Sequence, residues 1–272
     1  MAIYAFDGTT CTPRNLSNVF RMYDAYESRH KFYATGPGSR GTWLSKGIES
    51  MTGHGGKDRI YDAFEIWKYW QSRKSRETII VGFSRGAVIA RELANEICEK
   101  GGKVDFLGLY DSVGSFGNPF NMIDIGYRKS IPGGVVYCAQ ALSIHEKRFT
   151  FRVIRANLAK ANTQTTVQEC WFPGVHSDIG GTLKKGLGAA SLNWMFKQAS
   201  EAGTKQWNKG ALDEAEKNVD CNEEPSENKI SLPACFLRSL RTRKIREGDL
   251  KCGAGNPKPE PCNPKPVTRT TN

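Results

Sequence analysis

Short apolar runs alternate along the chain with stretches whose apolar positions recur at helical spacing. Strands are predicted for the apolar runs at 2–6, 31–35, 78–81, 104–111 and 167–172. Helices are predicted at 13–26, 60–70, 87–99, 136–146 and 189–202. Because strands that alternate with helices form parallel sheets, the pattern predicts an α/β fold with a mostly parallel central sheet and helices on both faces.

A serine in a glycine-rich turn joins one predicted strand to the helix that follows it. Ser84 is the centre of Gly82-Phe83-Ser84-Arg85-Gly86, which follows the run 78–81 and precedes the helix 87–99. This context is typical of a nucleophile elbow, whose strained turn lifts the serine hydroxyl above the sheet edge. The alternative is an ordinary strand–helix turn, in which the serine would have no catalytic partners. We interpret Ser84 as the candidate nucleophile.

A serine nucleophile needs a histidine base, and the chain holds only 4 histidines. His30 and His54 precede Ser84, whereas the base follows the serine in sites of this kind. His145 lies at the predicted end of a helix, a common place for a surface histidine. His176 follows a predicted strand on a turn-forming loop, where an open α/β sheet carries its chemistry. His176 is therefore the predicted base.

The acid that orients the base is expected between the serine and the histidine in the chain. Asp111 ends the apolar run 104–111 and enters a turn-rich stretch, so three strands would each deliver one group to the same sheet edge. In this reading His176 removes the Ser84 proton and Asp111 holds the imidazole tautomer. Asp178 and Asp7 are kept as loop-shaping residues or alternative acids, and Asp178 is expected to bond the backbone of Gly180-Gly181.

An oxyanion hole requires backbone N–H donors near the nucleophile. The N–H of Arg85 directly follows the serine at a helix N-terminus, where the dipole favours a developing negative charge. The loop after the first predicted strand leaves from the same edge of the sheet. The second donor is therefore expected to be the N–H of Gly8 or of Thr9.

Regular patterning fades after about Gly210, and the stretch 253–272 repeats Asn-Pro-Lys-Pro, as extended or disordered segments do. We therefore predict a catalytic domain at 1–210 and an irregular C-terminal extension at 211–272. Four cysteines lie singly in apolar runs and are expected to be core thiols: Cys11, Cys98, Cys138 and Cys170. Four others could form two disulfides in an oxidising compartment: Cys221, Cys235, Cys252 and Cys262.

The formal net charge of +11 favours anionic partners such as a phospholipid surface. A basic cluster lies in the extension: Arg238, Arg241, Arg243, Lys244 and Arg246. It is either a solvated helix face or a contact for a lipid headgroup or a partner. No aromatic residues interleave with it, so nucleic acid is not an expected partner.

Several function classes lack their sequence signals. No stretch approaches the roughly 18 apolar residues of a membrane span. The N-terminus reaches Asp7 without a basic region, so no signal peptide is predicted and synthesis in the cytoplasm is expected. The glycine-rich loop 36–42 lacks the Lys-Ser/Thr ending of a phosphate-binding loop. No C-x-x-C pair with a nearby histidine supports zinc, so neither a metal nor a cofactor is expected.

Four segments in order resemble a known family, the α/β-hydrolase group of type VI secretion lipase effectors, formerly a domain of unknown function. They are Phe6–Thr9, Gly82–Ala87, Tyr110–Gly114 and Gly174–Gly181, with weaker likeness at 51–53 and 141–149. The resemblance implies a Ser–Asp–His hydrolase with Ser84, Asp111 and His176 at the motif positions. It further implies phospholipase activity on membrane glycerophospholipids, deployed as an antibacterial toxin and neutralised by an immunity protein.

The expected activity is therefore that of a serine esterase or lipase, of phospholipase A type, in an antibacterial secreted effector. The expected partners are a phospholipid membrane surface, a cognate immunity protein and a component of the secretion machine. The expected route is synthesis in the cytoplasm and delivery to the periplasm of a target cell. Two alternatives stay open: a non-lipolytic esterase or thioesterase with the same triad, and a catalytically silent binding module on the same fold.

Overall fold

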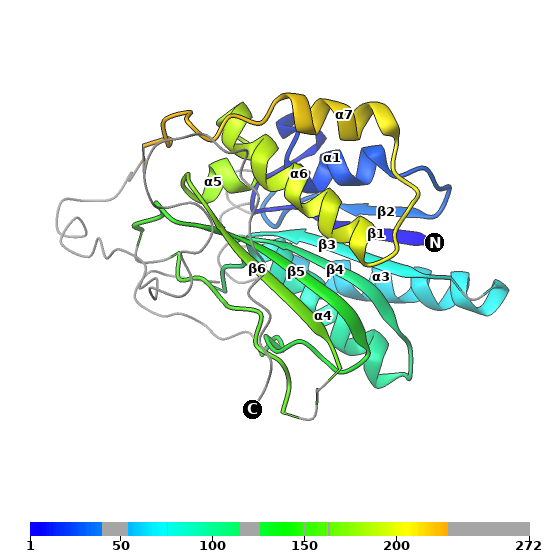
Figure 1. Cartoon of the computed structure of the whole chain (residues 1–272). Helices are drawn as coiled ribbons and strands as arrows, with labels where there is room; N and C mark the ends of the chain where they lie inside the picture. Colours follow the sequence, from blue (N-terminus) through cyan, green and yellow to red (C-terminus); the bar gives the residue numbers. More distant parts are fainter. Residues whose placement is uncertain are drawn as a thin grey trace.

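The computed structural model describes residues 1–39, 54–74, 76–114, 126–148, 151–160, 162 and 164–227. Six strands form one sheet in the order β2-β1-β3-β4-β5-β6 (Figure 1). Their bounds are β1 (Ala2–Phe6), β2 (Lys31–Ala34), β3 (Thr78–Phe83), β4 (Val104–Tyr110), β5 (Val135–Ser143) and β6 (Thr166–Phe172). All five pairings between neighbouring strands are parallel, which confirms the predicted mostly parallel sheet.

Helices cover both faces of this sheet. Their bounds are η1 (Pro13–Asn15), α1 (Asn18–Ala25), α3 (His54–Arg73), α4 (Arg85–Glu99), α5 (His176–Ile179), α6 (Lys185–Glu201) and α7 (Lys209–Lys217). Helices α3 and α4 lie on one face, α1 and α6 lie on the other, and α7 packs outside α6 (Figure 1). This arrangement of layers is the predicted α/β architecture.

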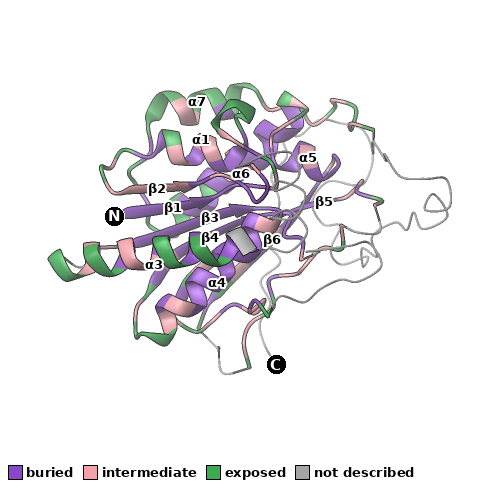
Figure 2. Ribbon diagram, turned by 180° about the vertical axis from the view of Figure 1, so that it is seen from behind, coloured by how far each residue is buried: buried purple, intermediate pink, exposed green. Residues whose placement is uncertain are grey.

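The central strands β1, β3 and β4 are buried on both faces, as Figure 2 shows for the centre of the sheet. Alternate residues of β3 contribute to two separate cores: Ile79 and Val81 face the α1 and α6 side, and Ile80 faces the α3 and α4 side. Because both faces must be apolar, a central parallel strand has a continuous apolar run instead of an alternating one. The run at 78–81 was recognisable as a strand for this reason.

The predicted helix at 136–146 is wrong, because these residues form most of strand β5. The strand pairs with β4 on one side and β6 on the other, so its backbone groups are bonded through the sheet. Its core residues Cys138, Ala139, Ala141 and Leu142 are fully buried. Small apolar residues at successive positions fit a doubly covered strand as well as a buried helix, so periodicity alone could not separate the two.

Two further elements differ from the expectation. The predicted helix at 13–26 is divided, because Leu16 has a left-handed φ of 48° and the Ser17 hydroxyl accepts the Phe20 N–H at 3.1 Å, which starts α1 afresh. Beyond Gly210, where regular patterning was expected to fade, α7 continues to residue 217 and buries Ala215 in the core. The extension therefore packs on the catalytic domain over its described residues, 211–227.

The cysteines agree with the expectation where they are described. Cys11, Cys98, Cys138 and Cys170 are thiols outside any disulfide, and all but the half-buried Cys98 are buried. Cys221 is disulfide-bonded. The remaining calls on the extension lie outside the described residues: Cys235, Cys252, Cys262, the basic cluster at 238–246 and the stretch 253–272. Among the described helices, none combines the length and apolar character that crossing a bilayer requires.

Candidate active site

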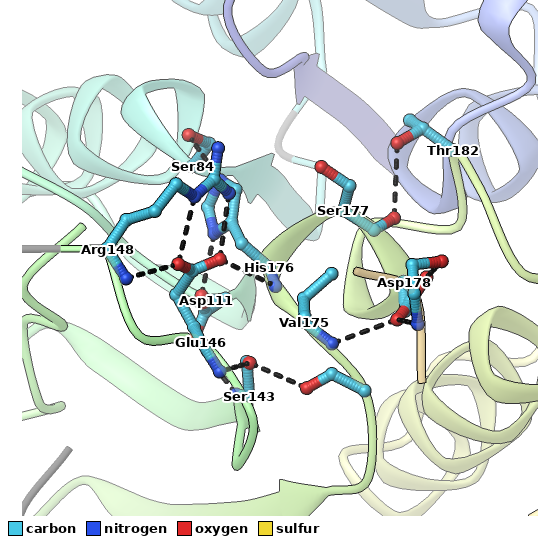
Figure 3. A network of polar contacts seen from close by, with 12 residues as sticks. Ser84, Asp111, Ser143, Glu146, Arg148, Val175, His176, Ser177, Asp178 and Thr182 are labelled. Atoms are coloured by element: carbon cyan, nitrogen blue, oxygen red, sulfur yellow. Dashed lines mark hydrogen bonds and ion pairs between the residues drawn. The ribbon is translucent and has the colours of Figure 1, made fainter. Parts of the chain in front are cut away.

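Three side chains far apart in the sequence meet at the carboxyl edge of the sheet (Figure 3). Ser84 follows β3, Asp111 follows β4, and His176 begins α5 after β6. The His176 Nε2 lies 2.8 Å from the Ser84 Oγ, and the His176 Nδ1 lies 2.6 Å from the Asp111 Oδ2. The strand order reverses between β1 and β3, and such a switch point is where open α/β sheets form their sites.

Ser84 occupies a strained backbone conformation that its two flanking glycines permit. Its φ and ψ are 58° and −123°, a region that side-chain-bearing residues seldom adopt. A Cβ on Gly82 would lie 2.6 Å from the Gly86 carbonyl oxygen, and a Cβ on Gly86 would lie 2.3 Å from the Phe6 carbonyl oxygen. The glycines therefore let α4 close against β1 and β3, and this packing holds the serine in its turn.

Asp111 is fully buried and is held by the strand next to it. Its N–H donates to the Ala141 carbonyl at 2.7 Å, and its Oδ1 accepts the Ser143 N–H at 3.0 Å. Its second carboxylate oxygen, Oδ2, lies against the imidazole of His176. An oriented carboxylate at Nδ1 places the Nε2 lone pair toward the serine hydroxyl.

His176 is 3% exposed, and its ring lies close to two phenylalanines. The Phe83 ring lies 4.7 Å from the imidazole, centroid to centroid, and the Phe151 ring approaches edge-on at 4.8 Å. Aromatic walls on two sides restrict rotation of the imidazole and keep bulk water from it. The site has the geometry that proton transfer between Ser84 and His176 requires.

Residues of the turn after β5 hold this histidine, and the sequence reasoning missed them because it placed them at the end of a helix. The Ser143 hydroxyl donates to the Gly174 carbonyl at 2.8 Å, and the Gly174 N–H donates to the His145 Nδ1 at 2.9 Å. The His176 N–H donates to the Glu146 carboxylate at 3.2 Å. The available signal was the weaker family likeness at 141–149, which covers these residues.

The residues predicted for the oxyanion hole lie together beside Ser84. The Gly8 N–H donates to the carboxylate of Asp7 at 2.7 Å. The Thr9 N–H has no acceptor within the described part of the chain, and the Thr9 hydroxyl accepts a hydrogen bond from the Arg85 side chain. Burial lowers the pKa of the Arg85 guanidinium to about 10, so it stays cationic at neutral pH. Of the two predicted loop donors, Thr9 is the one left for a ligand.

In the described part of the chain, neither alternative acid forms a hydrogen bond with the imidazole. Asp7 accepts hydrogen bonds from the Ser17 hydroxyl and the Tyr33 hydroxyl, each at 2.7 Å, as well as from Gly8. Burial raises the pKa of Asp7 above its usual value, against the opposing effect of these hydrogen bonds. Asp7 thus shapes the loop that carries Gly8 and Thr9.

Asp178 also shapes a loop, but through partners other than the expected ones. Its carboxylate accepts the Val175 N–H at 2.9 Å, and the N–H and hydroxyl of Ser226 at 3.0 and 2.6 Å. The expected side-chain bonds to the Gly180-Gly181 backbone are wrong. In Figure 3 this carboxylate lies apart from the group formed by Ser84, His176 and Asp111. Among the described residues, no cluster of His, Cys, Asp and Glu could hold a metal ion.

The parallel sheet and the strained serine between a strand and a helix define the α/β-hydrolase fold. The family model described as "T6SS, Phospholipase effector Tle1-like, catalytic domain" matches residues 2–102 and 95–198. The chain belongs to this family of type VI secretion system effectors. A search of the curated proteins found no match.

Solved structures share parts of this architecture. An uncharacterized protein from Pseudomonas aeruginosa is 21% identical, with a TM-score of 0.52, over 80% of this chain and 48% of that one. The Tle1 effector bound to the VgrG spike of the type VI secretion system is 24% identical, with a TM-score of 0.39, over 61% of this chain and 40% of that one. The RedJ thioesterase of the prodiginine pathway in Streptomyces coelicolor is 13% identical, with a TM-score of 0.41, over 66% of this chain and 84% of that one. The chain thus spans less than half of the first two proteins.

Proposed function

We propose that this chain is a serine hydrolase that cleaves carboxylic ester bonds of membrane phospholipids. The observation that carries the proposal is the continuous hydrogen-bond chain from the Ser84 hydroxyl through His176 to Asp111, at 2.8 and 2.6 Å. Membership in a family described by a phospholipase effector supports the substrate class. The formal net charge of +11 suits an anionic lipid surface.

The mechanism follows from the roles of these three groups. His176 Nε2 accepts the Ser84 proton as the serine oxygen attacks the ester carbonyl, and Asp111 stabilises the imidazolium that forms. The tetrahedral intermediate collapses when the imidazolium donates that proton to the departing alcohol, which leaves an acyl-serine. Water, deprotonated by His176, then attacks the acyl carbon. Release of the fatty acid returns the proton to Ser84.

The negative charge of the tetrahedral intermediate needs donors on the side of the site away from the base. We assign this role to the N–H of Arg85 and the N–H of Thr9. Gly8 is the less suitable of the two loop donors, because its N–H already donates to Asp7. The Arg85 side chain ties the two donor positions together through the Thr9 hydroxyl and brings a positive charge to the same place.

The biological setting is part of the proposal and rests on the family. The enzyme would be of phospholipase A type and would act as an antibacterial effector in the periplasm of a target cell. A component of the secretion machine would carry it there, and an immunity protein would protect the producing cell. The solved relative that is bound to a VgrG spike supports the first of these partners only by analogy.

The direct test measures fatty acid release from vesicles of phosphatidylethanolamine and phosphatidylglycerol. Ser84→Ala should lower the rate by at least about 10³-fold, because it removes the nucleophile while the fold is kept. Ser72→Ala is the matched control, since Ser72 is an exposed serine of α3 whose hydroxyl donates to the Tyr69 carbonyl of its own helix at 2.9 Å. A fluorophosphonate probe should label the wild type and the control but not Ser84→Ala.

The outcomes of this test separate the alternatives. Turnover of short-chain esters or thioesters, with none on vesicles, would replace the phospholipase by a non-lipolytic esterase or thioesterase. No turnover on any ester and no probe labelling would indicate a catalytically silent binding module. Either result would overturn the proposed function.

A further inference from the structure

A buried carboxylate lies beside the candidate base without being part of the Ser84–His176–Asp111 group. Glu146 is 1% exposed and sits in the turn after β5. Its Oε2 accepts the backbone N–H of His176 at 3.2 Å and the Nη2 of Arg148 at 2.8 Å. Its Oε1 accepts the backbone N–H and the Nε of Arg148 at 2.8 and 2.9 Å. Four donors converge on one carboxylate, and one of them is the main chain of the base.

Arg148 links this carboxylate to the surroundings of the imidazole ring through Phe151. Its guanidinium lies 3.5 Å from the centre of the Phe151 ring, and the Phe151 ring lies edge-on to His176 at 4.8 Å. Glu146 therefore holds the backbone of His176, while its partner Arg148 stacks on the ring that walls the side chain. Figure 3 shows Glu146 and Arg148 next to the Ser84–His176–Asp111 group.

The pair also sets the charge around the base. Burial raises the pKa of Glu146, but the hydrogen bonds and charge of Arg148, together with the nearby His176, hold that pKa below its usual value. Glu146 is therefore an anion at neutral pH. Two carboxylates thus act on the imidazole from different elements, Asp111 from the end of β4 and Glu146 from the turn after β5, with Arg148 as the counter-charge of the second.

Among the described residues, two other titratable side chains near this base bond partners other than the imidazole. His145, on the same turn, bonds the Gly174 N–H. Asp178, on α5, bonds Val175 and Ser226. Ser84 faces the imidazole from the turn between β3 and α4, and its hydroxyl carries no charge in the resting state. The charged residues that contact His176, or the Phe151 ring beside it, in the described part of the chain are Asp111, Glu146 and Arg148.

We propose that Glu146, paired with Arg148, is a positioning residue that fixes both the backbone and the electrostatic environment of the base His176. This inference rests on the proposed function, because it assigns His176 the role of base. A merely structural ion pair would change the rate through stability alone. A positioning pair of this kind must also change the pH dependence of the reaction, in opposite directions for its two members.

The expected results follow from the sign of each charge. Glu146→Gln removes a negative charge near the imidazole, so the acid limb of the kcat/KM profile should move to lower pH by about one unit. Arg148→Gln leaves the Glu146 carboxylate without its counter-charge, so the acid limb should move to higher pH. Both variants should lose about 10- to 100-fold in kcat, because a displacement of the base by about 1 Å costs about that much.

Arg148→Lys separates charge from geometry. It keeps the positive charge, so the acid limb should stay where it is in the wild type. It loses the two-pronged hydrogen bonding to Glu146 and the close guanidinium contact over the Phe151 ring, so kcat should still fall. Glu65→Gln is the matched control, because Glu65 forms an exposed ion pair with Lys68 at 2.6 Å on α3, and this variant should change neither quantity.

The experiment records short-chain ester hydrolysis and the rate of fluorophosphonate labelling of Ser84 as functions of pH, with urea unfolding as a check on folding. Opposite shifts for Glu146→Gln and Arg148→Gln, with none for Arg148→Lys, are the expected result. Acid limbs that coincide with the wild type in all three variants would overturn the inference. If Glu146→Gln does not fold, the two Arg148 variants decide the question. A wild type without hydrolysis and without labelling would instead overturn the proposed function.

Discussion

Gly180, at the end of α5, faces the aromatic wall of the site across a very short distance. A Cβ at this position would lie 2.2, 2.5 and 2.6 Å from three atoms of the Phe83 ring. The ring cannot retreat freely, because a Cβ on Gly8 would meet the same ring at 2.5 Å, and His176 lies 4.7 Å from its centroid. Gly180→Ala therefore perturbs the base through a single side chain.

The backbone does not oppose this substitution, so its cost is steric. Gly180 has φ −72° and ψ −6°, which alanine adopts without strain. Ordinary contact begins near 3.4 Å, so the Phe83 ring must move by about 1 Å. Overpacking of this kind costs about 1–3 kcal/mol, and the reduced freedom of the unfolded chain offsets about 0.5 kcal/mol. We expect a net loss of about 1–2 kcal/mol in the free energy of unfolding. Because the imidazole packs against this ring, we also expect the rate of Ser84 labelling to fall by about 100-fold.

Urea unfolding and fluorophosphonate labelling measure these two effects on the same samples. Gly210→Ala is the control, because Gly210 is exposed in α7 and its Cβ would meet only the Asn208 Oδ1, at 3.2 Å. The double variant Phe83→Leu with Gly180→Ala should lose at least about 1 kcal/mol less stability than the sum of the two single losses, because the smaller side chain makes room for the Cβ. Unfolding and labelling of Gly180→Ala equal to the wild type would refute the reasoning.

Two further predictions concern residues that hold the site from outside. Burial, with the charge of Lys147, lowers the pKa of His145 below the ordinary 6.5. Only the neutral imidazole accepts the Gly174 N–H. The contribution of this hydrogen bond to stability is therefore present above pH 6.5 and lost as the pH falls. The urea midpoint of the wild type should therefore fall more between about pH 7 and pH 5 than that of His145→Asn, whose side chain accepts without titrating; equal falls would contradict this. The Glu223 carboxylate accepts the N–H groups of Gly186 and Leu187 at 2.8 and 3.2 Å and caps α6 from a distant segment, so Glu223→Ala should lose about 1 kcal/mol and Glu223→Gln less. An unchanged urea midpoint in Glu223→Ala would show that this cap does not stabilise α6.

The sequence predicted the meeting of Ser84, Asp111 and His176 because each follows a strand that local chemistry identifies. The glycines around Ser84 are required because a Cβ at either position would lie only 2.3 to 2.6 Å from a backbone carbonyl oxygen, so their spacing carries information about the fold itself. Asp111 and His176 follow apolar runs whose carboxyl ends lie at one edge of any parallel sheet. The prediction that these side chains are catalytic is a separate matter, which the experiments above address.

The partners that hold the site were not predictable in the same way. Asp178 was expected to bond the two glycines that follow it, a local pattern, but its carboxylate bonds Ser226, which is 48 residues away. The choice of Thr9 over Gly8 as the second oxyanion donor depends on the hydrogen bond from the Gly8 N–H to the carboxylate of Asp7. Contacts of this kind depend on tertiary placement, which neither spacing nor periodicity encodes.

The wrong prediction of a helix in place of β5 matters most for the site, because β5 links the acid Asp111 to the loop of the base His176. Phe83 is in register with Tyr110, and Tyr110 with Ala141, so β3, β4 and β5 reach the edge at one level. Two residues further on, Ser143 donates its N–H to Asp111 and its hydroxyl to the Gly174 carbonyl in the loop that leads to the base. A shift of β5 by one residue would turn this side chain to the other face of the sheet and break both links together. The distance between the acid and the base is therefore fixed by the register of β5, and the turn that bears Glu146 is held in place by the same register.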